Sequence, residues 1–214
     1  MRLLLIGPPG GGKGTQAKFL IDRFAIPQIS TGNMLRGNIH NNTSLGQDAQ
    51  KFMKSGQLVP DSIILDMMKK RLAEEDCCNG FILDGFPRTI PQAEGLYNLL
   101  KGMNQKLDHV IVMDLPDNLI ITRLSNRRSC KGCGQVYNLI FEPPKNAGKC
   151  NICNEDLYLR EDDNPATIQR RLTVYHQQTK PVIKYYSDQR LTKIIDSKGT
   201  IDEIRSDILK NITS

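Results

Sequence analysis

The chain has 214 residues, of which 24% are charged and 39% are hydrophobic, the balance of an ordinary soluble globular protein. The sequence holds no internal repeat, no low-complexity segment and no apolar run near the ~20 residues that cross a bilayer, which excludes repeat, fibrous and membrane-spanning classes. A net charge of +6 suits a polyanionic partner, either a nucleotide or a nucleic acid.

Short apolar runs alternate with amphipathic segments along most of the chain. Residues 2–6 read as a buried strand, and apolar residues then recur at helical spacing over 13–24. Further strands are predicted at 26–30, 81–83, 109–115 and 191–196. Further helices are predicted from Ser30, over 45–55, after a capping Asp61, over 90–101, from 116, from 164 and over 200–212. Strands that alternate with helices indicate a parallel sheet with helical crossovers, so we predict an α/β fold.

A glycine-rich loop separates the first predicted strand from the first helix. It reads GPPGGGK from Gly7 to Lys13 and fits the phosphate-binding pattern G-x(4)-G-K. Glycines let successive backbone N–H groups turn toward an anion, and the start of the helix adds partial positive charge. Because Gly14 follows the lysine where a Ser or Thr is commoner, either Thr15 is the candidate ligand for Mg²⁺ or the metal is held mainly elsewhere. We predict that this loop binds phosphate groups through Gly10, Gly11, Gly12, Lys13, Gly14 and Thr15, which the family resemblance described below assigns to ATP.

Two Cys-x-x-Cys pairs lie in the segment 127–163, where the alternation of strands and helices stops. Cys130 and Cys133 form the first pair, and Cys150 and Cys153 form the second, with sixteen residues between the pairs. This spacing predicts a tetrahedral zinc site, and four thiolates leave no open position for a reacting water. A disulfide is the weaker alternative, because nothing in the sequence directs the chain to an oxidising compartment. We therefore predict a small inserted unit that a structural zinc ion stabilises.

The order Gly-Lys-Gly-Thr in the loop resembles the nucleoside monophosphate kinases, and further motifs narrow the resemblance to the adenylate kinase family. In chain order these motifs are Thr31-Gly32 with Arg36, Gly56-x-x-Val59-Pro60-Asp61, Asp84-Gly85-Phe86-Pro87-Arg88-Thr89 with Gln92, Arg127, Arg160-x-Asp162-Asp163 and Arg171-Leu172. The resemblance implies a P-loop NTPase-type parallel sheet core flanked by helices, with a helical NMP-binding insert and a small zinc-bearing lid. It implies a core of residues 1–29, 60–126 and 164–214, the NMP-binding insert at 30–59 and the lid at 127–163.

The resemblance also implies the reaction and its partners. The family transfers a phosphoryl group reversibly from Mg·ATP to AMP and forms two ADP, with Mg²⁺ as cofactor beside the structural Zn²⁺. We expect a monomer that binds neither nucleic acid nor a membrane. The opening MRLLLIG offers only five apolar residues before the glycines, too few for the apolar core of a secretory signal, so we expect a cytoplasmic protein.

The resemblance assigns site residues position by position. AMP is expected to contact Thr31, Arg36, Gln57, Leu58, Val59, Gly85, Phe86, Pro87, Arg88, Gln92, Arg160 and Arg171. Besides the loop, ATP is expected to contact Arg127, Val136, Tyr137 and Gly199. The expected catalytic residues are Lys13, Asp84, Arg88, Arg123, Arg127, Arg160 and Arg171. Thr31 and Gln92 would read the acceptor base, whereas Asp84 would approach Mg²⁺ from the end of a strand.

Arginines suit this chemistry because phosphoryl transfer has a loose transition state with charge spread over the equatorial oxygens. Planar guanidinium groups match such oxygens better than ammonium groups do. Arg170 lies about 100° around its helix from Arg171, so it is expected to face elsewhere.

Two alternative functions remain open at this point. A P-loop module could read nucleic acid with its zinc ribbon, which has the basic flank Arg123, Arg127, Arg128 and Lys131. The aromatic residues of the ribbon are widely spaced, which disfavours a row of stacked bases. A GTPase switch is the second alternative, but the sequence contains no N-K-x-D guanine motif.

Overall fold

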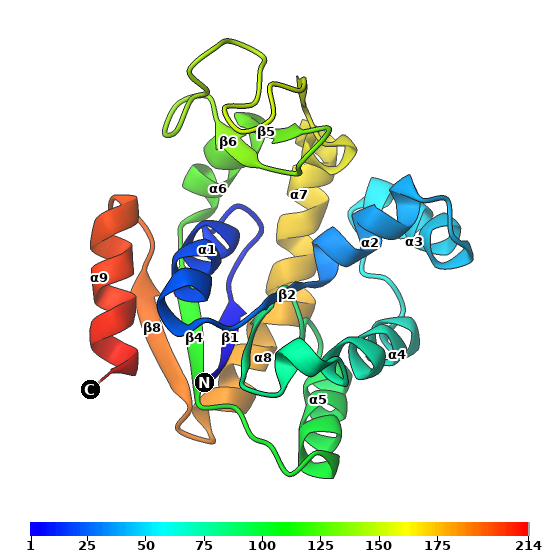
Figure 1. Cartoon of the computed structure of the whole chain (residues 1–214), viewed down its shortest axis with the longest axis vertical. Coiled ribbons are helices and arrows are strands. Elements are labelled where there is room, and N and C mark those ends of the chain that lie inside the picture. The colour runs from blue at the N-terminus through cyan, green and yellow to red at the C-terminus, as the bar shows by residue number, and fades with distance from the viewer. Residues whose placement is uncertain (214) are drawn as a thin grey trace.

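A computed structural model describes residues 1–213 of the chain, and its centre is a five-stranded parallel sheet in the order β2-β3-β1-β4-β8 (Figure 1). The strands are β1 Arg2–Ile6, β2 Gln28–Ser30, β3 Phe81–Asp84, β4 His109–Asp114 and β8 Thr192–Asp196. The carboxyl ends of parallel strands meet at one edge of the sheet, where open α/β proteins bind their ligands. The predicted α/β fold is confirmed.

Helices cover both faces of this sheet. Helices α1 (Lys13–Phe24) and α9 (Ile201–Ile212) pack on one face, and α4 (Asp61–Leu72), α5 (Ile90–Gly102) and α8 (Lys180–Ser187) pack on the other. Successive side chains of a strand point to opposite faces, so Leu3 and Leu5 enter the first layer and Leu4 enters the second. All three are at most 1% exposed, which explains why this strand is an unbroken apolar run.

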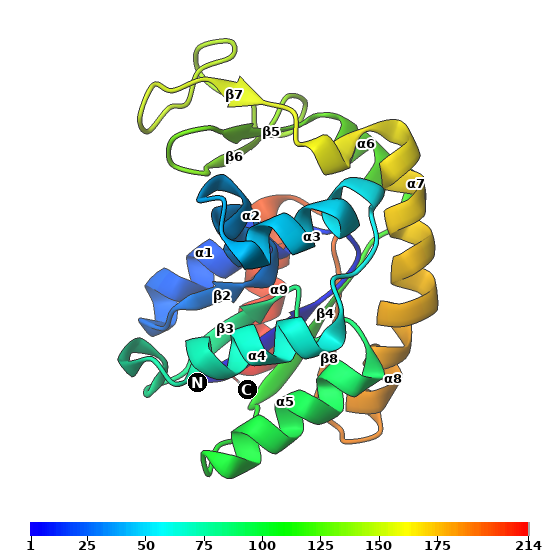
Figure 2. The ribbon, with the colours of Figure 1, turned by 90° about the vertical axis from the view of Figure 1, so that its right-hand side faces the viewer.

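Two smaller units stand apart from the five-stranded sheet, a helical pair that Figure 1 shows to its right and an antiparallel sheet at the top of Figure 1 and Figure 2. Helices α2 (Thr31–His40) and α3 (Ser44–Ser55) form a helical pair, and α3 ends at Gly56. A three-stranded antiparallel sheet, ordered β6-β5-β7, consists of β5 Arg127–Cys130, β6 Val136–Asn138 and β7 Leu157–Tyr158. Helix α6 (Asp117–Ser125) and the 3-10 turn η2 (Glu161–Asp163) connect this antiparallel sheet to the rest of the chain. A further 3-10 turn, η1, spans Glu75–Cys77.

The long helix predicted from residue 164 is in fact composite. Helix α7 (Pro165–Val174) passes into a π-helical turn, η3 (Tyr175–Thr179), before α8 begins. Pro181 is close to the start of α8, and its missing N–H prevents the regular α-helical hydrogen bonds from continuing through this point. Figure 2 shows α7 and α8 running along one side of the molecule, from the antiparallel sheet toward the far end of the five-stranded sheet.

Two smaller expectations differ from the structure. The strand predicted from residue 26 begins at Gln28. Asp61 does not cap α4: Pro60 occupies the cap position, and the Asp61 carboxylate accepts hydrogen bonds from residues of α5 and its cap. Within residues 1–213, no helix combines the length and apolar character that a bilayer crossing requires.

The close crossing of α2 and α3 depends on Gly46, where an added Cβ would overlap the backbone of Asn38. We expect Gly46→Ala to lower the free energy of unfolding by about 1–3 kcal/mol, because the two helices must move apart. Gly37 on α2 is the matched control, since no described heavy atom outside its chain neighbours and its own helix backbone lies within 4 Å of a Cβ built there. Gly37→Ala should stabilise the protein by up to about 1 kcal/mol through helix propensity. Urea unfolding measures both, and equal effects would contradict the close crossing.

Candidate active site

A cleft of about 1290 Å³ opens at the carboxyl ends of β1 and β3. It exceeds the ~300–1,000 Å³ that is usual for a site holding one small ligand, so it has room for more than one. The predicted site residues that line it are Gly10, Gly11, Gly12, Lys13, Gly14, Thr15, Thr31, Arg36, Gln57, Leu58, Val59, Asp84, Gly85, Pro87, Arg88, Gln92, Arg123, Arg127, Val136, Tyr137, Arg160, Arg171 and Gly199. The structure therefore brings together residues that lie up to about 190 positions apart in the sequence.

The glycine-rich loop has the backbone shape that an anion site needs. Gly10 and Gly12 have φ angles of 77° and 88°, in the left-handed region that residues with a Cβ rarely enter. The Lys13 ammonium group donates to the carbonyl oxygens of Gly7 and Pro8 at 2.8 and 2.7 Å, across its own loop. Lys13 is thereby held over the concave side of the loop, at the start of α1.

The electrostatic environment of Lys13 favours an anionic ligand. Burial above all, against the opposing effect of Asp84 and with smaller contributions from the positive charges of Arg88 and Arg171, lowers the pKa of Lys13 to about 8. Burial and the charge of Arg171 lower the pKa of Arg88 to about 10. Both groups carry their charge at neutral pH, so an anion that enters the cleft meets concentrated positive potential.

One buried carboxylate joins two of the cleft arginines. Arg127 on β5 donates from Nε and Nη2 to the Asp163 oxygens Oδ2 and Oδ1, at 2.7 and 2.6 Å. Arg171 on α7 donates to the same Oδ1 at 2.8 Å. Asp163 is 1% exposed, so it forms these bonds away from water, where ionic hydrogen bonds are strong. Asp163 thus fixes an arginine of the antiparallel sheet against an arginine of the core helices.

The other arginines are held by single contacts. Arg36 donates to Asn33 Oδ1 at 2.6 Å, and Arg88 donates from Nε to the carbonyl of Gly85 at 2.7 Å. Arg160 is 9% exposed and donates from Nε to Ser129 at 2.7 Å. Burial, followed by the charges of Arg127 and Arg36, lowers the pKa of Arg160 to about 9. Their remaining N–H groups are available to phosphate oxygens.

Arg123 lies at the side of the cleft next to Gly199. Its Nη2 atom donates to the Ser197 carbonyl at 2.9 Å, and its guanidinium carbon lies 5.7 Å from the centre of the Phe141 ring. Phe141 is 57% exposed and also lines the cleft, although the sequence analysis did not single it out. An exposed aromatic ring beside a flat guanidinium group is a surface on which a base can stack.

The opposite side of the cleft contains two nearly buried polar side chains. The Thr31 hydroxyl donates to the Gly85 carbonyl at 2.7 Å, and Gln92 accepts a hydrogen bond from the Arg88 backbone N–H at 2.8 Å. Thr31 is 3% exposed and Gln92 is 2% exposed. Polar groups so placed can discriminate between ligands by hydrogen bonding.

The oxygen ligands expected for Mg²⁺ lie near the start of α1. Asp84 ends β3, and its Oδ2 atom accepts from Gln28 at 2.9 Å and lies 3.7 Å from a Cβ built on Gly14. Thr15 is exposed on the first turn of the helix. Carboxylate and hydroxyl oxygens are suitable ligands for a partly hydrated Mg²⁺ ion, and glycine at position 14 keeps the space beside Asp84 open.

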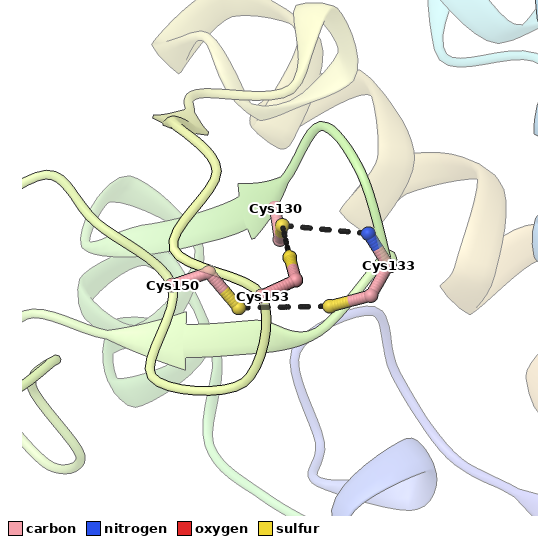
Figure 3. Close-up of side chains that lie close together, drawn as sticks. All are labelled: Cys130, Cys133, Cys150 and Cys153. Atoms are coloured by element: carbon pink, nitrogen blue, oxygen red, sulfur yellow. Dashed lines mark hydrogen bonds between the residues drawn. The ribbon is translucent and has the colours of Figure 1, made fainter.

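The four predicted cysteine ligands come together in the antiparallel unit (Figure 3). Their sulfur atoms all lie within 4.8 Å of one another, with 3.3 Å between Cys130 and Cys153 and 3.5 Å between Cys133 and Cys150. Tetrahedral zinc with bonds of ~2.3 Å to sulfur implies sulfur–sulfur separations of about 3.8 Å. The cluster is therefore close enough to bind a metal ion.

The sequence model of the family described as adenylate kinase matches residues 5–191 of this chain. The chain is 48% identical over 210 residues to the adenylate kinase of Lachnospira eligens, covering 98% of this chain and 99% of the relative. It is 49% identical over 210 residues to the adenylate kinase of Caldicellulosiruptor bescii, with 98% of both chains covered. It is 49% identical over 212 residues to the adenylate kinase of a Geobacter species, with 99% of both chains covered.

The chain belongs to the adenylate kinase family.

Family membership confirms the predicted reaction class. The chain is a nucleoside monophosphate kinase, a transferase that moves a phosphoryl group between ATP and AMP to give ADP. The α/β core and the four-cysteine cluster are those expected of an adenylate kinase with a metal-binding lid. The GTPase alternative is excluded.

The structure limits what the side chains of Phe86 and Tyr137 can contribute to a nucleotide site. Phe86 is fully buried in the core, so only its backbone can contribute to a nucleotide site. Tyr137 is 3% exposed, and its hydroxyl accepts from the Asn151 N–H and lies 3.3 Å from the sulfur of Cys150. The Tyr137 ring therefore belongs to the cysteine unit, although the residue borders the cleft.

Asp163 and Phe141 are the contributors whose roles the sequence analysis did not predict. In the sequence, Asp163 was noted only as part of the motif Arg160-x-Asp162-Asp163. The predicted cluster of arginines was the available signal, because buried arginines generally require a carboxylate partner. No pattern in the sequence identified Phe141, because the ring lies in an irregular segment between the two cysteine pairs.

If Lys13 contacts the phosphates of ATP as the sequence predicts, its lowered pKa should make the affinity for ATP depend on pH. Bound ATP favours the charged ammonium group, and the ATP phosphates are already ionised above their last pKa of about 6. We expect the affinity for ATP to fall above about pH 8, by at most about tenfold per pH unit, because the free protein must then take up a proton to bind. Calorimetry in two buffers of different ionisation enthalpy measures that uptake. Equal proton uptake in Lys13→Met, or pH-independent affinity, would contradict this role.

Proposed function

We propose that this adenylate kinase holds the phosphates of ATP on the loop of residues 10–15 and holds AMP between the α2–α3 pair and β3. The observation that carries the proposal is the convergence of Lys13 with arginines from α2, the loop after β3, β5 and α7 on one cleft. Two nucleotides bring several negative charges into one space, and this concentration of cations matches them.

The donor nucleotide uses the side of the cleft between the loop and the antiparallel sheet. Gly10, Gly11, Gly12, Gly14 and Thr15 offer backbone N–H groups at the start of α1, and Lys13 reaches the outer phosphates. Arg123 and Arg127 contact the phosphates and the base of ATP. The adenine of ATP lies near Val136, Tyr137 and Gly199, which border this part of the cleft.

The acceptor nucleotide uses the opposite side. Arg36 and Arg88 hold the phosphate of AMP, and Gly85, Pro87 and the Phe86 backbone flank it. Thr31 and Gln92 face the adenine. Gln57, Leu58 and Val59 surround the base along the segment that follows α3. Arg160 and Arg171 lie between the two nucleotides and bridge the reacting phosphates.

The transfer needs positioning and fixed charge rather than a base. A phosphate oxygen of AMP attacks the γ-phosphorus of ATP, a new P–O bond forms, and the bond to the β-phosphate oxygen breaks, which leaves two ADP. The attacking oxygen of AMP is already ionised, so no proton has to be removed. The guanidinium groups of Arg88, Arg160 and Arg171 hold the reacting oxygens in line and stabilise their charge. Asp84 and Thr15 would hold Mg²⁺, which when bound neutralises phosphate charge.

We propose that residues 1–29, 60–126 and 164–214 form the core, with 30–59 and 127–163 as two mobile inserts. Closure of such inserts, for which adenylate kinases are themselves a known example, excludes water from the reaction. Contacts that join the units support the proposal: Lys54 on α3 pairs with Glu161 on η2 at 3.3 Å, and Lys18 on α1 donates to Gln135 beside β6. Such exposed contacts are weak enough to break on opening.

We propose a structural zinc ion, held by Cys130, Cys133, Cys150 and Cys153, in a monomeric cytoplasmic protein that binds neither nucleic acid nor a membrane. None of the six cysteines, all within residues 1–213, forms a disulfide bond, which suits a reducing compartment. Zinc would supply folding energy to a unit whose buried cluster consists only of Cys130, Tyr137 and Cys150, with Leu157 packed against it, among the described residues.

Product formation from Mg·ATP with AMP, GMP, CMP, UMP or water tests the proposed acceptor site. Rapid formation of ADP with AMP, and at least about 10²-fold less with the other acceptors, is expected because a wrong base leaves buried polar groups unpaired. Preference for another monophosphate would remove the roles of Thr31 and Gln92. Consumption of ATP at an equal rate without any acceptor would contradict the two-nucleotide cleft.

Arg88→Ala tests the proposed role of the arginines. We expect kcat to fall by about 10²–10³-fold with the fold intact, because one preorganised charge at the transferred group is lost. Arg170→Ala is the matched control, since that exposed side chain donates, within residues 1–213, only to the Ser55 carbonyl, at 3.4 Å. Steady-state kinetics with circular dichroism measure both, and near-normal turnover of Arg88→Ala would contradict the role.

Metal analysis and chelation test the zinc proposal. We expect about one zinc ion per chain, and a chelator or Cys150→Ser should release it and lower the midpoint of thermal unfolding. Cys78→Ser is the control, because this exposed cysteine lies outside the cluster. A purified protein without metal, with the same unfolding midpoint before and after chelation, would contradict a structural zinc.

A further inference from the structure

Asp61 links α4 to the start of α5 through both of its carboxylate oxygens. Oδ1 accepts a hydrogen bond from the side-chain amide of Gln92 at 2.7 Å, and Oδ2 accepts one from the hydroxyl of Thr89 at 3.0 Å. Thr89 is the cap of α5, where its hydroxyl oxygen accepts from the backbone N–H of Gln92 at 3.2 Å. The carboxylate is therefore attached to the turn that carries Gln92.

These contacts determine which end of the Gln92 amide is oxygen and which is nitrogen. An ionised carboxylate only accepts hydrogen bonds, so the amide nitrogen must face Asp61. A backbone N–H only donates, and Arg88 donates to the Gln92 oxygen at 2.8 Å. A flipped amide would place oxygen against carboxylate and nitrogen against N–H, which are two repulsive contacts. The orientation follows from the chemistry of the partners.

The fixed amide can discriminate between purine bases. Gln92 is 2% exposed and borders the cleft beside Thr31, and each end of its amide keeps one further hydrogen-bonding capacity. Adenine presents an amino donor at position 6 beside a ring nitrogen that accepts. Guanine presents a carbonyl acceptor at position 6 beside a ring N–H that donates. The fixed oxygen and nitrogen complement the adenine edge and oppose the guanine edge.

We propose that Asp61 is a positioning residue for base selection, which holds the Gln92 amide in the orientation that accepts AMP and rejects GMP. The inference rests on the proposed placement of the acceptor base at Gln92. Asp61 acts through Gln92 and leaves ATP, on the far side of the cleft, unaffected. Without the Asp61 carboxylate, only the backbone N–H of Arg88 holds the Gln92 amide. The amide can then flip by exchanging its oxygen and nitrogen, and the flipped amide complements guanine.

The test compares kcat/KM for AMP with kcat/KM for GMP in the full-length protein. We expect Asp61→Ala to lower the AMP-to-GMP ratio by about tenfold or more, mainly through a higher KM for AMP, with KM for ATP unchanged. Asp61→Asn keeps an oxygen that accepts from Gln92, and should stay within about threefold of the unchanged protein. Asp66→Ala, on the exposed side of α4, is the matched control and should leave the ratio unchanged.

Both kcat/KM values are measured on the same enzyme sample, so a misfolded fraction lowers both equally and leaves their ratio unchanged. An unchanged ratio in Asp61→Ala, or an equal loss in Asp61→Asn, would overturn the proposal. Gln92→Ala separates this outcome from failure of the acceptor site. If Gln92→Ala also leaves the ratio unchanged, the placement of the base is wrong. If it lowers the ratio while Asp61→Ala does not, only the role of Asp61 is wrong.

Discussion

The buried carboxylate of Asp163 is the interaction on which the active site depends. Arg127 and Arg171 come from the antiparallel sheet and from α7, and both donate to this carboxylate, which is the ion-pair partner of Arg127, whereas Arg171 also pairs with Asp162 at 2.9 Å. Buried ion pairs rarely add net stability, because desolvation offsets their attraction, but removing one partner leaves an uncompensated charge. Asp163 therefore contributes mainly by fixing where the two guanidinium groups lie relative to each other.

The cleft nevertheless keeps an excess of positive charge. The pKa of Asp162 shows the effect of this positive charge. Burial acts to raise that pKa, yet the surrounding arginines, led by Arg171, hold it below its ordinary value. The pKa of Lys13 is lowered mainly by burial, and the charges of Arg88 and Arg171 contribute to this lowering against the effect of Asp84. Phosphate groups bound in the cleft, as we propose, would relieve repulsion among these cations. This preorganisation is what a loose, highly charged transition state requires.

Sequence reasoning predicted the parts of the fold and site that local patterns encode. The apolar run of β1, the loop that ends at Lys13 and the two cysteine pairs each have a physical signature within a few residues. The resemblance to the adenylate kinase family identified the site arginines, which lie far apart in the sequence and which no local sequence pattern links to one another. Most boundaries were correct within two residues, and the composite α7–α8 helix was missed because a π-helical turn leaves no pattern of its own.

What the sequence did not reveal are contacts between side chains from separate elements. The orientation of the Gln92 amide depends on Asp61 and on one backbone N–H, and neither is visible as spacing. Asp61 even looked like a helix cap, because an aspartate just before an apolar helical pattern usually is one. The burial of Phe86 and of the Tyr137 ring likewise depends on tertiary packing rather than on local sequence.

The most direct measurement is kcat of Asp163→Asn at saturating Mg·ATP and AMP, at a temperature where circular dichroism shows the variant folded. An asparagine keeps the shape of the side chain but turns an N–H donor toward one of the two guanidinium groups. We predict that kcat falls by about 10²–10³-fold, because the negative charge shared by Arg127 and Arg171 is lost and one guanidinium group then faces an N–H donor. A kcat within about twofold of the unchanged protein would contradict the central place of Asp163.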